Sequence, residues 1–437
     1  MSDHSPNLFP ILRAKLDDAD ASLLRQWTLA TKKFGDEEAD AGMSLRGVSR
    51  EVLVSCLDEV KRHPDWTTKD LCDQFIKPLT KQFQCSLVNL IRAVLGDDIA
   101  VVASEGEEGR HWTQQATIFV SHAWKYQARD LLGTLCDRAT GSAREYYWID
   151  TITVNQHETG VTRDFDWWCS TFRQSIKTIG RTYLVLAPYE DPIPLTRSWC
   201  LFEVDSTDVV GADFEICLPT LQQDRFRKSL LDGKFNFNKW VSVLDLTRSE
   251  ACKPEDRDSI MAVVNATTGG VQRLNENVLS KLRDWLLDEG RQALAEARKT
   301  QKDVDLFGSI NNLARLLDDI GNLKEAEPLH REALAGRRAK LGDQHPDTLT
   351  SINNLGLLLH KQGKLKEAEP LYREALAGRR AKLGDQHPST LRSINNLGAL
   401  LRTIGNLKEA EPLFREALAG FRAKLGDQHP DTLSCIN

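Results

Sequence analysis

The chain has 437 residues, more than one hydrophobic core usually serves, so we expect two or three domains. Its formal net charge of −6 offers no basic surface to nucleic acid or to anionic lipid, and neither is an expected partner. The sequence begins without a secretory signal pattern and contains no apolar run long enough to span a bilayer, which favours a cytoplasmic protein. The 9 cysteines are scattered and never spaced as CxxC, so we expect reduced, mostly buried thiols.

The N-terminal part, residues 1–110, is predicted to be helical. Apolar residues recur at helical spacing between Leu71 and Leu79 and again between Leu87 and Val94. Residues 104–109 are acidic and contain two glycines, which indicates a linker to the next domain. No chemistry is assigned to this region.

Residues 116–247 are predicted to form an α/β domain. Short apolar runs alternate here with helical patterns, which favours a five-stranded parallel sheet with crossover helices in a flavodoxin-like order. The predicted strands are residues 117–120, 146–149, 182–186, 214–218 and 241–244. Residues 248–305 follow as a helical extension, with amphipathic helices at 256–264 and 275–297.

Polar and aromatic residues follow the first two predicted strands directly. Ser121, His122 and Trp124 come after the first strand, and Asp150 comes after the second. Parallel sheets hold their functional groups at the carboxyl ends of the strands, so these residues form a candidate site. The third strand leads into the segment SWCLFE, read as the start of a helix with Ser198 as its N-cap.

Three segments of this domain resemble a TIR domain: the strand ending in FVSH, the strand YWID and the helix SWCLFE. In the TIR members that cleave NAD, the glutamate of a WCxxE motif is catalytic, and Glu203 occupies that position. Two features differ from the family. The first strand continues as SHAW where many TIR domains carry Ser-Tyr-Arg or Ser-Phe-Arg, and the loop 151–164 has its own sequence.

The resemblance implies hydrolysis of NAD at the nicotinamide glycosidic bond. A carboxylate that binds the ribose hydroxyls and stabilises an oxocarbenium-like transition state suffices, because nicotinamide is a good leaving group. We predict that Glu203 is catalytic and that the substrate is contacted by Ser121, His122, Trp124, Asp150 and Trp199. NAD is the substrate, and no cofactor is expected.

Structural roles compete with several of these assignments. Trp199 and Cys200 are also suited to the core face of their helix, Trp124 to either the core or the site, and Asp150 to capping the turn that follows it. His122 and His157 do not indicate a metal site, so none is predicted. The sequence contains no Walker loop, GxGxxG or GxSxG, which excludes a P-loop NTPase, a Rossmann dehydrogenase and a serine hydrolase.

Residues 309–437 repeat with a period of 42, beginning at Ser309, Ser351 and Ser393. The pattern of each unit predicts two helices. In the unit that begins at Ser309, the first helix ends near Gly321, and the second helix is capped by Asn322 and ends near Gly342. Pro328 falls inside the second helix. A histidine recurs in each connector, at His345, His387 and His429, and is expected to close the turn between units rather than bind a metal.

These units resemble the tetratricopeptide repeats of kinesin light chains, through their long second helix and the connector GDQHPDTL. The resemblance implies an all-α solenoid whose first helices line a groove for a protein or peptide. Asn312, Asn354 and Asn396 stand where amides would hold a ligand backbone, or else they bond neighbouring helices. At Cys435 a fourth unit would open, so either the array continues beyond Asn437 or its end binds a partner or itself.

Two functional hypotheses result. In the first, the repeats bind a partner in signalling or defence, and the TIR-like domain hydrolyses NAD when clustered. In the second, the protein is a non-enzymatic adaptor whose TIR-like domain self-associates. A motor-cargo linker is a weaker third hypothesis, since it requires a heptad coiled coil that the sequence lacks.

Overall fold

The computed structural model describes residues 7–41, 45–96, 100–101, 110–139, 145–157, 165–251 and 253–434. The contacts divide the chain into two compact units, one formed by residues 1–224 and 238–285 and the other by residues 225–237 and 286–437. The linker predicted at 104–109 and the opening of a fourth repeat at 435–437 lie outside the described residues, as does much of the loop 151–164.

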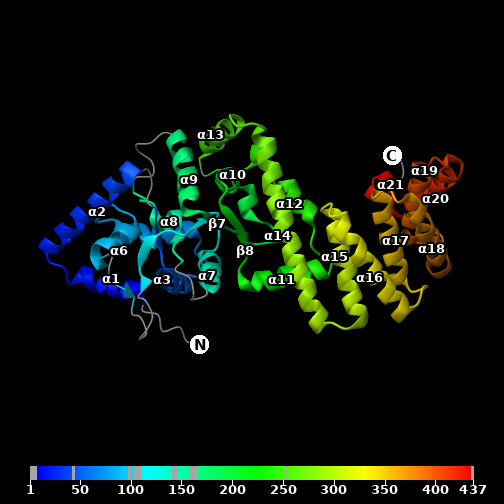
Figure 1. Ribbon diagram of the computed structural model, residues 1–437, viewed down its shortest axis with the longest axis horizontal. Coiled ribbons are helices and arrows are strands. Elements are labelled where there is room, and N and C mark those ends of the chain that lie inside the picture. The colour runs from blue at the N-terminus through cyan, green and yellow to red at the C-terminus, as the bar shows by residue number, and fades with distance from the viewer. Residues whose placement is uncertain are drawn as a thin grey trace. The chain divides into compact units, whose positions relative to one another are not determined.

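The first unit is built on a mixed sheet of six strands in the order β4-β1-β6-β5-β7-β8 (Figure 1). Strands β6, β5, β7 and β8 are parallel neighbours, and they correspond to the second, first, third and fourth predicted strands. Strand β1 is antiparallel to both β4 and β6. The bounds are β1 (Arg46–Val48), β4 (Thr113–Gln115), β5 (Ile118–Ser121), β6 (Tyr147–Trp148), β7 (Arg181–Val185) and β8 (Asp213–Cys217). A separate two-stranded ribbon consists of β2 (Ala100–Val101) and β3 (Arg110–His111).

The predicted fifth strand at 241–244 is wrong, because that segment belongs mainly to helix α12 (Phe237–Val243). Phe237, Trp240 and Leu244 are all buried, and their spacing of three and four residues is that of a helix face. Residues 241–244 show the alternation typical of a strand. The helical spacing becomes visible only when Phe237 and Trp240 are included. The sheet is therefore neither five-stranded nor wholly parallel.

The N-terminal region is helical as predicted, but it also supplies strand β1 to the sheet. Gly47 in β1 lies so close to β6 that an added Cβ would meet the carbonyl carbon of Tyr146 at 2.9 Å. A larger residue would push the two strands apart. The helices of this region are α1 (Leu8–Asp17), α2 (Ala21–Ala41), α3 (Arg50–Lys61), α4 (Thr68–Leu71), the π-helix η1 (Cys72–Ile76), α5 (Lys77–Thr80) and α6 (Leu87–Leu95).

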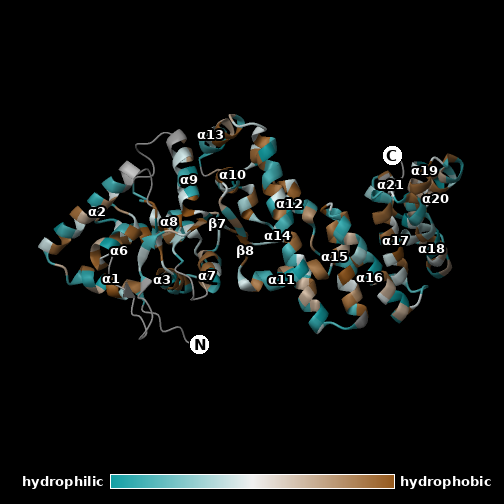
Figure 2. Cartoon of the chain, viewed as in Figure 1, coloured by the Kyte–Doolittle hydropathy of each residue, from teal (hydrophilic) through white to brown (hydrophobic). Residues whose placement is uncertain are grey.

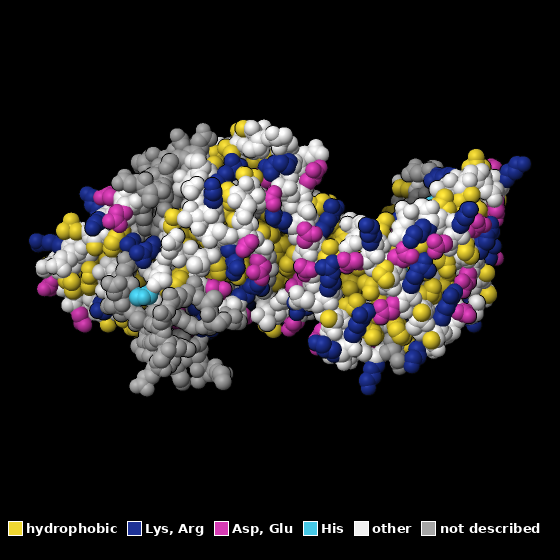
Figure 3. All heavy atoms as spheres, in the orientation of Figure 1, with side chains coloured by type: hydrophobic (Ala, Val, Ile, Leu, Met, Phe, Trp, Pro, Cys, Tyr) yellow, Lys and Arg dark blue, Asp and Glu magenta, His cyan; other side chains and the backbone are white. Residues whose placement is uncertain are grey.

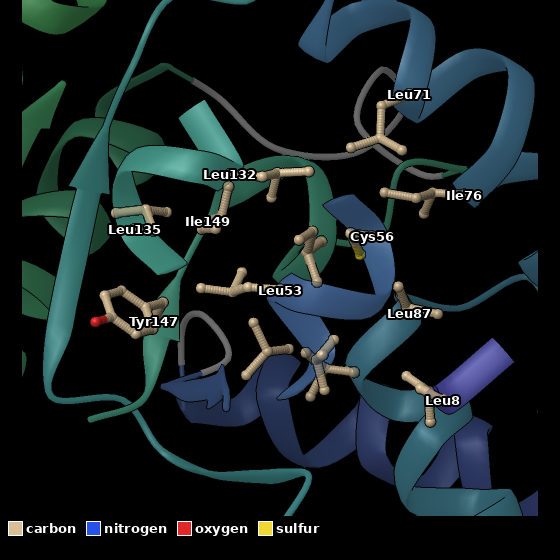
Figure 4. Packing of buried hydrophobic residues seen from close by; sticks show 14 of the residues in the cluster. Leu8, Leu53, Cys56, Leu71, Ile76, Leu87, Leu132, Leu135, Tyr147 and Ile149 are labelled. Carbon is tan, nitrogen blue, oxygen red and sulfur yellow. The ribbon is translucent and has the colours of Figure 1, made fainter. Parts of the chain in front are cut away.

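Alternate side chains of the central strand β5 enter two different cores. Ile118 and Val120 join a large cluster with α1, α3, α6 and α7, part of which Figure 4 shows around Leu53. Phe119 points to the other face, where its ring stacks on Trp148 with the centroids 4.8 Å apart and where α9 and α10 pack. Helices therefore cover both faces of the sheet.

The helices that follow β5 in the first unit alternate with the remaining strands. They include the short helices on which the candidate site depends. Their bounds are α7 (Ala128–Arg138), α8 (Asp150–Thr153), α9 (Phe165–Ile179), the 3-10 helix η2 (Ile193–Thr196), α10 (Ser198–Val210), α11 (Thr220–Leu231), the 3-10 helix η3 (Leu246–Arg248), α13 (Pro254–Asn265) and α14 (Gly270–Thr300). Helices α11, α12 and α14 contribute residues to both units.

The second unit contains the three helix pairs predicted from the 42-residue period. Gly321 ends the first helix with a φ of +89°, and the Asn322 side chain caps the second helix by accepting from the Glu325 N–H. His345 caps the next helix by accepting from the Asp347 N–H. The pairs are α15 (Asp303–Asp319) with α16 (Leu323–Leu341), α17 (Pro346–Lys361) with α18 (Leu365–Leu383), and α19 (Pro388–Ile404) with α20 (Leu407–Leu425), followed by α21 (Pro430–Ser434).

Apolar and polar residues alternate around each repeat helix, so that one side packs and the other faces water (Figure 2). Basic and acidic side chains are interspersed over the exposed surface of these helices (Figure 3). Arg338 of α16 reaches Glu374 of α18 at 2.6 Å, and one unit later Arg380 reaches Glu416 at 2.6 Å. The ion pairs between successive repeats therefore recur with the same 42-residue period as the sequence.

Two further expectations can be compared with the described residues. Seven cysteines are free and buried as predicted, while Cys252 and Cys435 lie outside the described part of the chain. Within that part, no helix combines the length and the apolar composition that a bilayer span requires.

Candidate functional site

The candidate site in the first unit forms at the carboxyl ends of β5 and β6. The two strands are parallel, with Phe119 opposite Trp148, and this register brings Ser121 level with Asp150. Ser121 is buried at 1% exposure, and the Asp150 side chain is 31% exposed. The strand ends therefore juxtapose these two predicted residues, as the topology requires.

Asp150 is the centre of a hydrogen-bonded group. The Trp124 indole N–H donates to its Oδ2 at 2.7 Å, and the Thr151 N–H donates to its Oδ1 at 2.6 Å. The Gln156 side chain donates to the Asp150 carbonyl at 2.7 Å. Asp150 thus fixes the position of the Trp124 ring and also holds the turn that follows. The second contact corresponds to the predicted capping role, and the contact with substrate stays a prediction.

His122 is buried next to the Asp150 carboxylate. Its Nε2 is 3.6 Å from Asp150 Oδ1, and its side chain is 1% exposed. Burial lowers the pKa of His122 although the Asp150 charge acts in the opposite direction, so the ring is neutral at pH 7. In the described part of the chain, no three histidine, cysteine or acidic side chains gather as metal ligands would.

Glu203 reaches the same strand ends from helix α10. Cys200 lies three residues earlier on the same side of the helix, and its thiol contacts the His122 carbonyl at 3.5 Å. The Glu203 side chain is half-buried, and its own carbonyl accepts from the Thr207 hydroxyl at 2.7 Å. Glu203 of α10 is therefore a neighbour of Ser121 at the end of β5, and Cys200 of the same helix contacts His122 directly after that strand.

The environment of Glu203 favours its protonated form. Burial raises the pKa of Glu203 to about 8, the Asp150 charge acts in the same direction, and the Ser121 hydroxyl opposes them. The Ser121 Oγ makes no hydrogen bond of good geometry, but it is close enough to influence this carboxyl. A ligand that brought positive charge to the strand ends would lower the pKa of Glu203 and favour its carboxylate.

Trp199 is not brought together with these residues. Its ring lies in an aromatic cluster with Phe165 and Phe172, each at a centroid distance of 5.5 Å, on the face of the sheet that α9 covers. Its indole N–H donates to Asp256 at 3.2 Å. This placement corresponds to the core role rather than to the predicted contact with substrate.

The predicted N-cap of α10 is also wrong. The helix begins at Ser198, and the residue in the N-cap position is Arg197, with an extended backbone. The Ser198 hydroxyl lies 2.7 Å from the Ser249 hydroxyl instead of bonding the helix N-terminus. The Ser198 hydroxyl, which the sequence pattern assigned to capping, therefore bonds the neighbouring segment 249–250 instead.

Five residues in and around this site were not among the predicted site residues. Gln156 could not be identified, because nothing in the sequence relates it to Asp150. Cys200 could have been identified, because it lies three residues before Glu203 in a predicted helix and therefore on the same side of that helix. Lys125 and Arg197 both contact Glu250, and that glutamate belongs to no motif.

The second candidate site is the row of asparagines in the repeats. The Asn354 amide donates to the Asn311 side chain at 3.3 Å, and the Asn396 amide donates to Asn353 at 3.1 Å. The Asn312 amide donates to the Leu231 carbonyl at 2.8 Å, within the same compact unit. Each amide thus already bonds a neighbouring helix, which is the alternative that the sequence left open.

Two surface pockets can be compared with the predicted residues. One of about 460 Å³ is lined by residues of α12, η3 and α14, including Leu244 and Asn275. Another of about 520 Å³ lies on α20 and includes Phe414 and Arg422. Neither is lined by a predicted site residue.

A model of the tetratricopeptide repeat family matches residues 305–381 and 353–423. This match agrees with the helix pairs and with the 42-residue period. The C-terminal part of the chain is therefore built of tetratricopeptide repeats, a class of repeat that mediates protein–protein interaction.

The solved structures that are similar to this chain include two repeat proteins. A putative kinesin light chain from Podosopora anserina with nearly identical TPR-like repeats is 24% identical, with a TM-score of 0.31, over 36% of this chain and 78% of that chain. BtubC (BKLC) from P. vanneervenii is 19% identical, with a TM-score of 0.31, over 62% of this chain and 95% of that chain. At these TM-scores the likeness adds nothing to the family match. The comparison with curated proteins found no match.

Proposed function

We propose that the protein couples partner binding by its tetratricopeptide repeats to hydrolysis of NAD by a TIR-like domain in the first unit, and that clustering activates the hydrolysis. The observation that carries this proposal is the meeting of Glu203 with Ser121 and Asp150 at the carboxyl ends of parallel strands. The setting is one of signalling or defence.

Glu203 supplies the carboxyl group that the reaction needs. The nicotinamide ring of bound NAD carries a positive charge, which favours ionisation of this raised-pKa carboxyl at the moment of binding. The carboxylate then accepts from the ribose hydroxyls and stabilises the oxocarbenium-like transition state as the bond from ribose to nicotinamide breaks. Water adds to the same ribose carbon, loses a proton and completes the hydrolysis. Trp124, which Asp150 fixes in position, offers an aromatic edge or face to the substrate.

A second function, a non-enzymatic adaptor, is favoured by a different observation. Glu203 is half-buried, its raised pKa favours the protonated form at pH 7, and it lines neither of the described pockets. A filled space at the strand ends is what an adaptor would tolerate. In that case the first unit acts by self-association and the repeats bind the partner.

The experiment that separates the two functions measures nicotinamide release from NAD. Purified full-length protein is assayed in solution and again when clustered by dense immobilisation on beads. Glu203→Gln removes the carboxyl with little change of shape, and Asp208→Asn serves as a matched control, because Asp208 is an exposed carboxylate on the same helix that pairs with Lys281 at 3.1 Å.

We expect clustered wild type and Asp208→Asn to release nicotinamide, and clustered Glu203→Gln to lose at least about 100-fold in rate, as is common when a group acting on the transition state is removed. Equal rates for wild type and Glu203→Gln would sink the enzymatic proposal. No release from any form, with clustering verified, would leave the adaptor as the function.

A further inference from the structure

Two arginines, seven residues apart, join the second helix of each inner repeat to the second helix of the next repeat. Each arginine pairs with a glutamate that lies 36 residues further along the chain. The pairs are Arg331 with Glu367, Arg338 with Glu374, Arg373 with Glu409 and Arg380 with Glu416, at 3.0, 2.6, 2.8 and 2.6 Å. The complement of this row of arginines is therefore a helix with two glutamates at the same spacing of seven residues.

Helix α20, at the C-terminal end of the array, repeats the arginines (Figure 1). Arg415 and Arg422 stand at the positions that bind the next repeat in the inner units. Among the residues that the structure describes, Arg415 pairs with Glu411 and Arg422 with Asp427, both within their own repeat. Their side chains are 79% and 52% exposed, whereas the four inner arginines are between 38% and 48% exposed. The row of cations thus continues to the last described repeat, where it faces water.

An apolar stripe accompanies these two arginines on α20. Phe414 and Leu418 are only half-buried, although Tyr372 and Leu376, at the same positions one repeat earlier, are 0% and 6% exposed. Leu407 of the same stripe is 62% exposed. The stripe and the two arginines line a hollow of about 520 Å³. In the inner repeats this side of the second helix is covered by the next helix pair, and here it is open.

The repeats of a second copy do not supply the glutamates that would complete this surface. The glutamates of α18 and α20 are paired with the arginines of the preceding repeat. Those of α16, Glu325 and Glu332, are paired with Arg291 and Arg298 of α14. Every row of glutamates on the described repeats is thus already occupied, so charge complementarity favours a helix of a different protein.

We propose that the outer side of α20 binds an amphipathic helix of a partner protein, one that carries an apolar stripe and two glutamates seven residues apart. The glutamates pair with Arg415 and Arg422, and the apolar stripe covers Leu407, Phe414 and Leu418 as the next repeat does inside the array. This surface is separate from the groove of the first helices. The inference rests on the partner binding of the proposed function and not on the hydrolysis of NAD.

The probe is a fluorescent peptide with the sequence of residues 346–383, the helix pair α17 and α18, which carries the required glutamates. A helix pair is chosen because an isolated helix of this length is marginal in water. Arg373 and Arg380 of the peptide are replaced by glutamine, so that peptides do not stack on one another. Full-length protein is titrated into the peptide, and binding is followed by fluorescence anisotropy.

The double variant Arg415→Glu/Arg422→Glu reverses both cations. Lys424→Glu is the matched control, because Lys424 is an exposed basic residue on the same helix that does not line the hollow. We expect wild type and Lys424→Glu to bind the peptide equally and the double variant to bind it at least about tenfold more weakly, since two attractions become repulsions. A second peptide, with lysine in place of both glutamates, should bind the double variant and not wild type. Misfolding of the variant could not produce that reciprocal exchange.

Leu407→Asp tests the apolar stripe and should also weaken binding about tenfold, at a site too exposed for the fold to depend on it. Four results would overturn the proposal: no binding by wild type, equal binding by the double variant, equal weakening by Lys424→Glu, or peptide-free protein that self-associates in sedimentation unless Arg415 and Arg422 are reversed. The last result would assign the surface to a second copy. Because the titration contains no NAD, its failure and that of the hydrolase are distinguishable.

Discussion

The two compact units of this chain differ in whether their ion pairs recur along the sequence. In the repeats, pairs such as Arg338 with Glu374 recur one unit later as Arg380 with Glu416, and all four side chains are about one third exposed. In the first unit, Arg273 pairs once with Asp205, which is fully buried. Repetition spreads stability over many weak contacts, whereas a buried pair such as Arg273 with Asp205 concentrates it in one contact.

The largest expected effect tests the buried side of this comparison. Arg273 binds Asp205 at two points, 2.7 Å at one oxygen and 2.9 Å at the other, so Arg273→Ala leaves a buried carboxyl without its partner. We expect a loss of about 3–5 kcal/mol in the free energy of unfolding. Urea unfolding followed by tryptophan fluorescence reports this unit specifically, because all 10 tryptophans lie within it.

Arg273→Lys is the control, since it keeps the charge but not the planar fork, and it should lose less than Arg273→Ala. A loss below about 1 kcal/mol in the alanine variant would place the pair among ordinary surface pairs. The contrast between the two units would then disappear.

How far the sequence predicted each unit follows from the same contrast. The repeats could be predicted in detail, because Asn322, Gly321 and His345 carry local capping signals that are repeated along the chain. Contacts between units of a repeat follow from the period itself. The role of Asn354 could not be predicted, because its position in the sequence is the same whether its amide bonds a ligand or a neighbouring helix.

The first unit could be predicted only in part. Ser121 and Asp150 were found, because parallel strands end at one edge whatever their order. Strand β1 was missed, since three residues at 46–48 carry no period, and their pairing depends on Gly47 and on strands distant in sequence. Glu250 was missed for a similar reason, as its partners lie 125 and 53 residues away.

A smaller effect concerns the candidate site and depends on pH. The pKa of Glu203 is raised from 4.5 to about 8 in the folded protein. The folded protein therefore binds this proton more tightly than the unfolded chain does. This contribution is complete below pH 4.5 and is lost progressively as the pH rises towards 8. Glu203→Gln mimics the protonated carboxyl at every pH and therefore removes this pH dependence.

The variant should therefore match wild type near pH 4.5 and exceed its stability at pH 8 by on the order of 2 kcal/mol. Thermal unfolding across this range, again followed by tryptophan fluorescence, measures the difference. A constant offset between the two proteins at all pH values would contradict a raised pKa. Asp208→Asn, on the same helix, should show no such growth with pH.

The smallest effect tests the periodic side of the comparison. Arg338→Ala and Arg380→Ala each remove one exposed pair from equivalent positions, and each should cost about 0.2–1 kcal/mol. The two losses should agree with each other and should shrink as salt is added, because screening acts on exposed charges first. Circular dichroism at 222 nm reports the helices of both units, so the repeats are followed as the part of that signal that changes while the tryptophan fluorescence transition of the first unit does not. If one variant cost several times more than the other, the equivalence that the sequence period predicts would not extend to energies, and the array would have to be treated, like the first unit, one contact at a time.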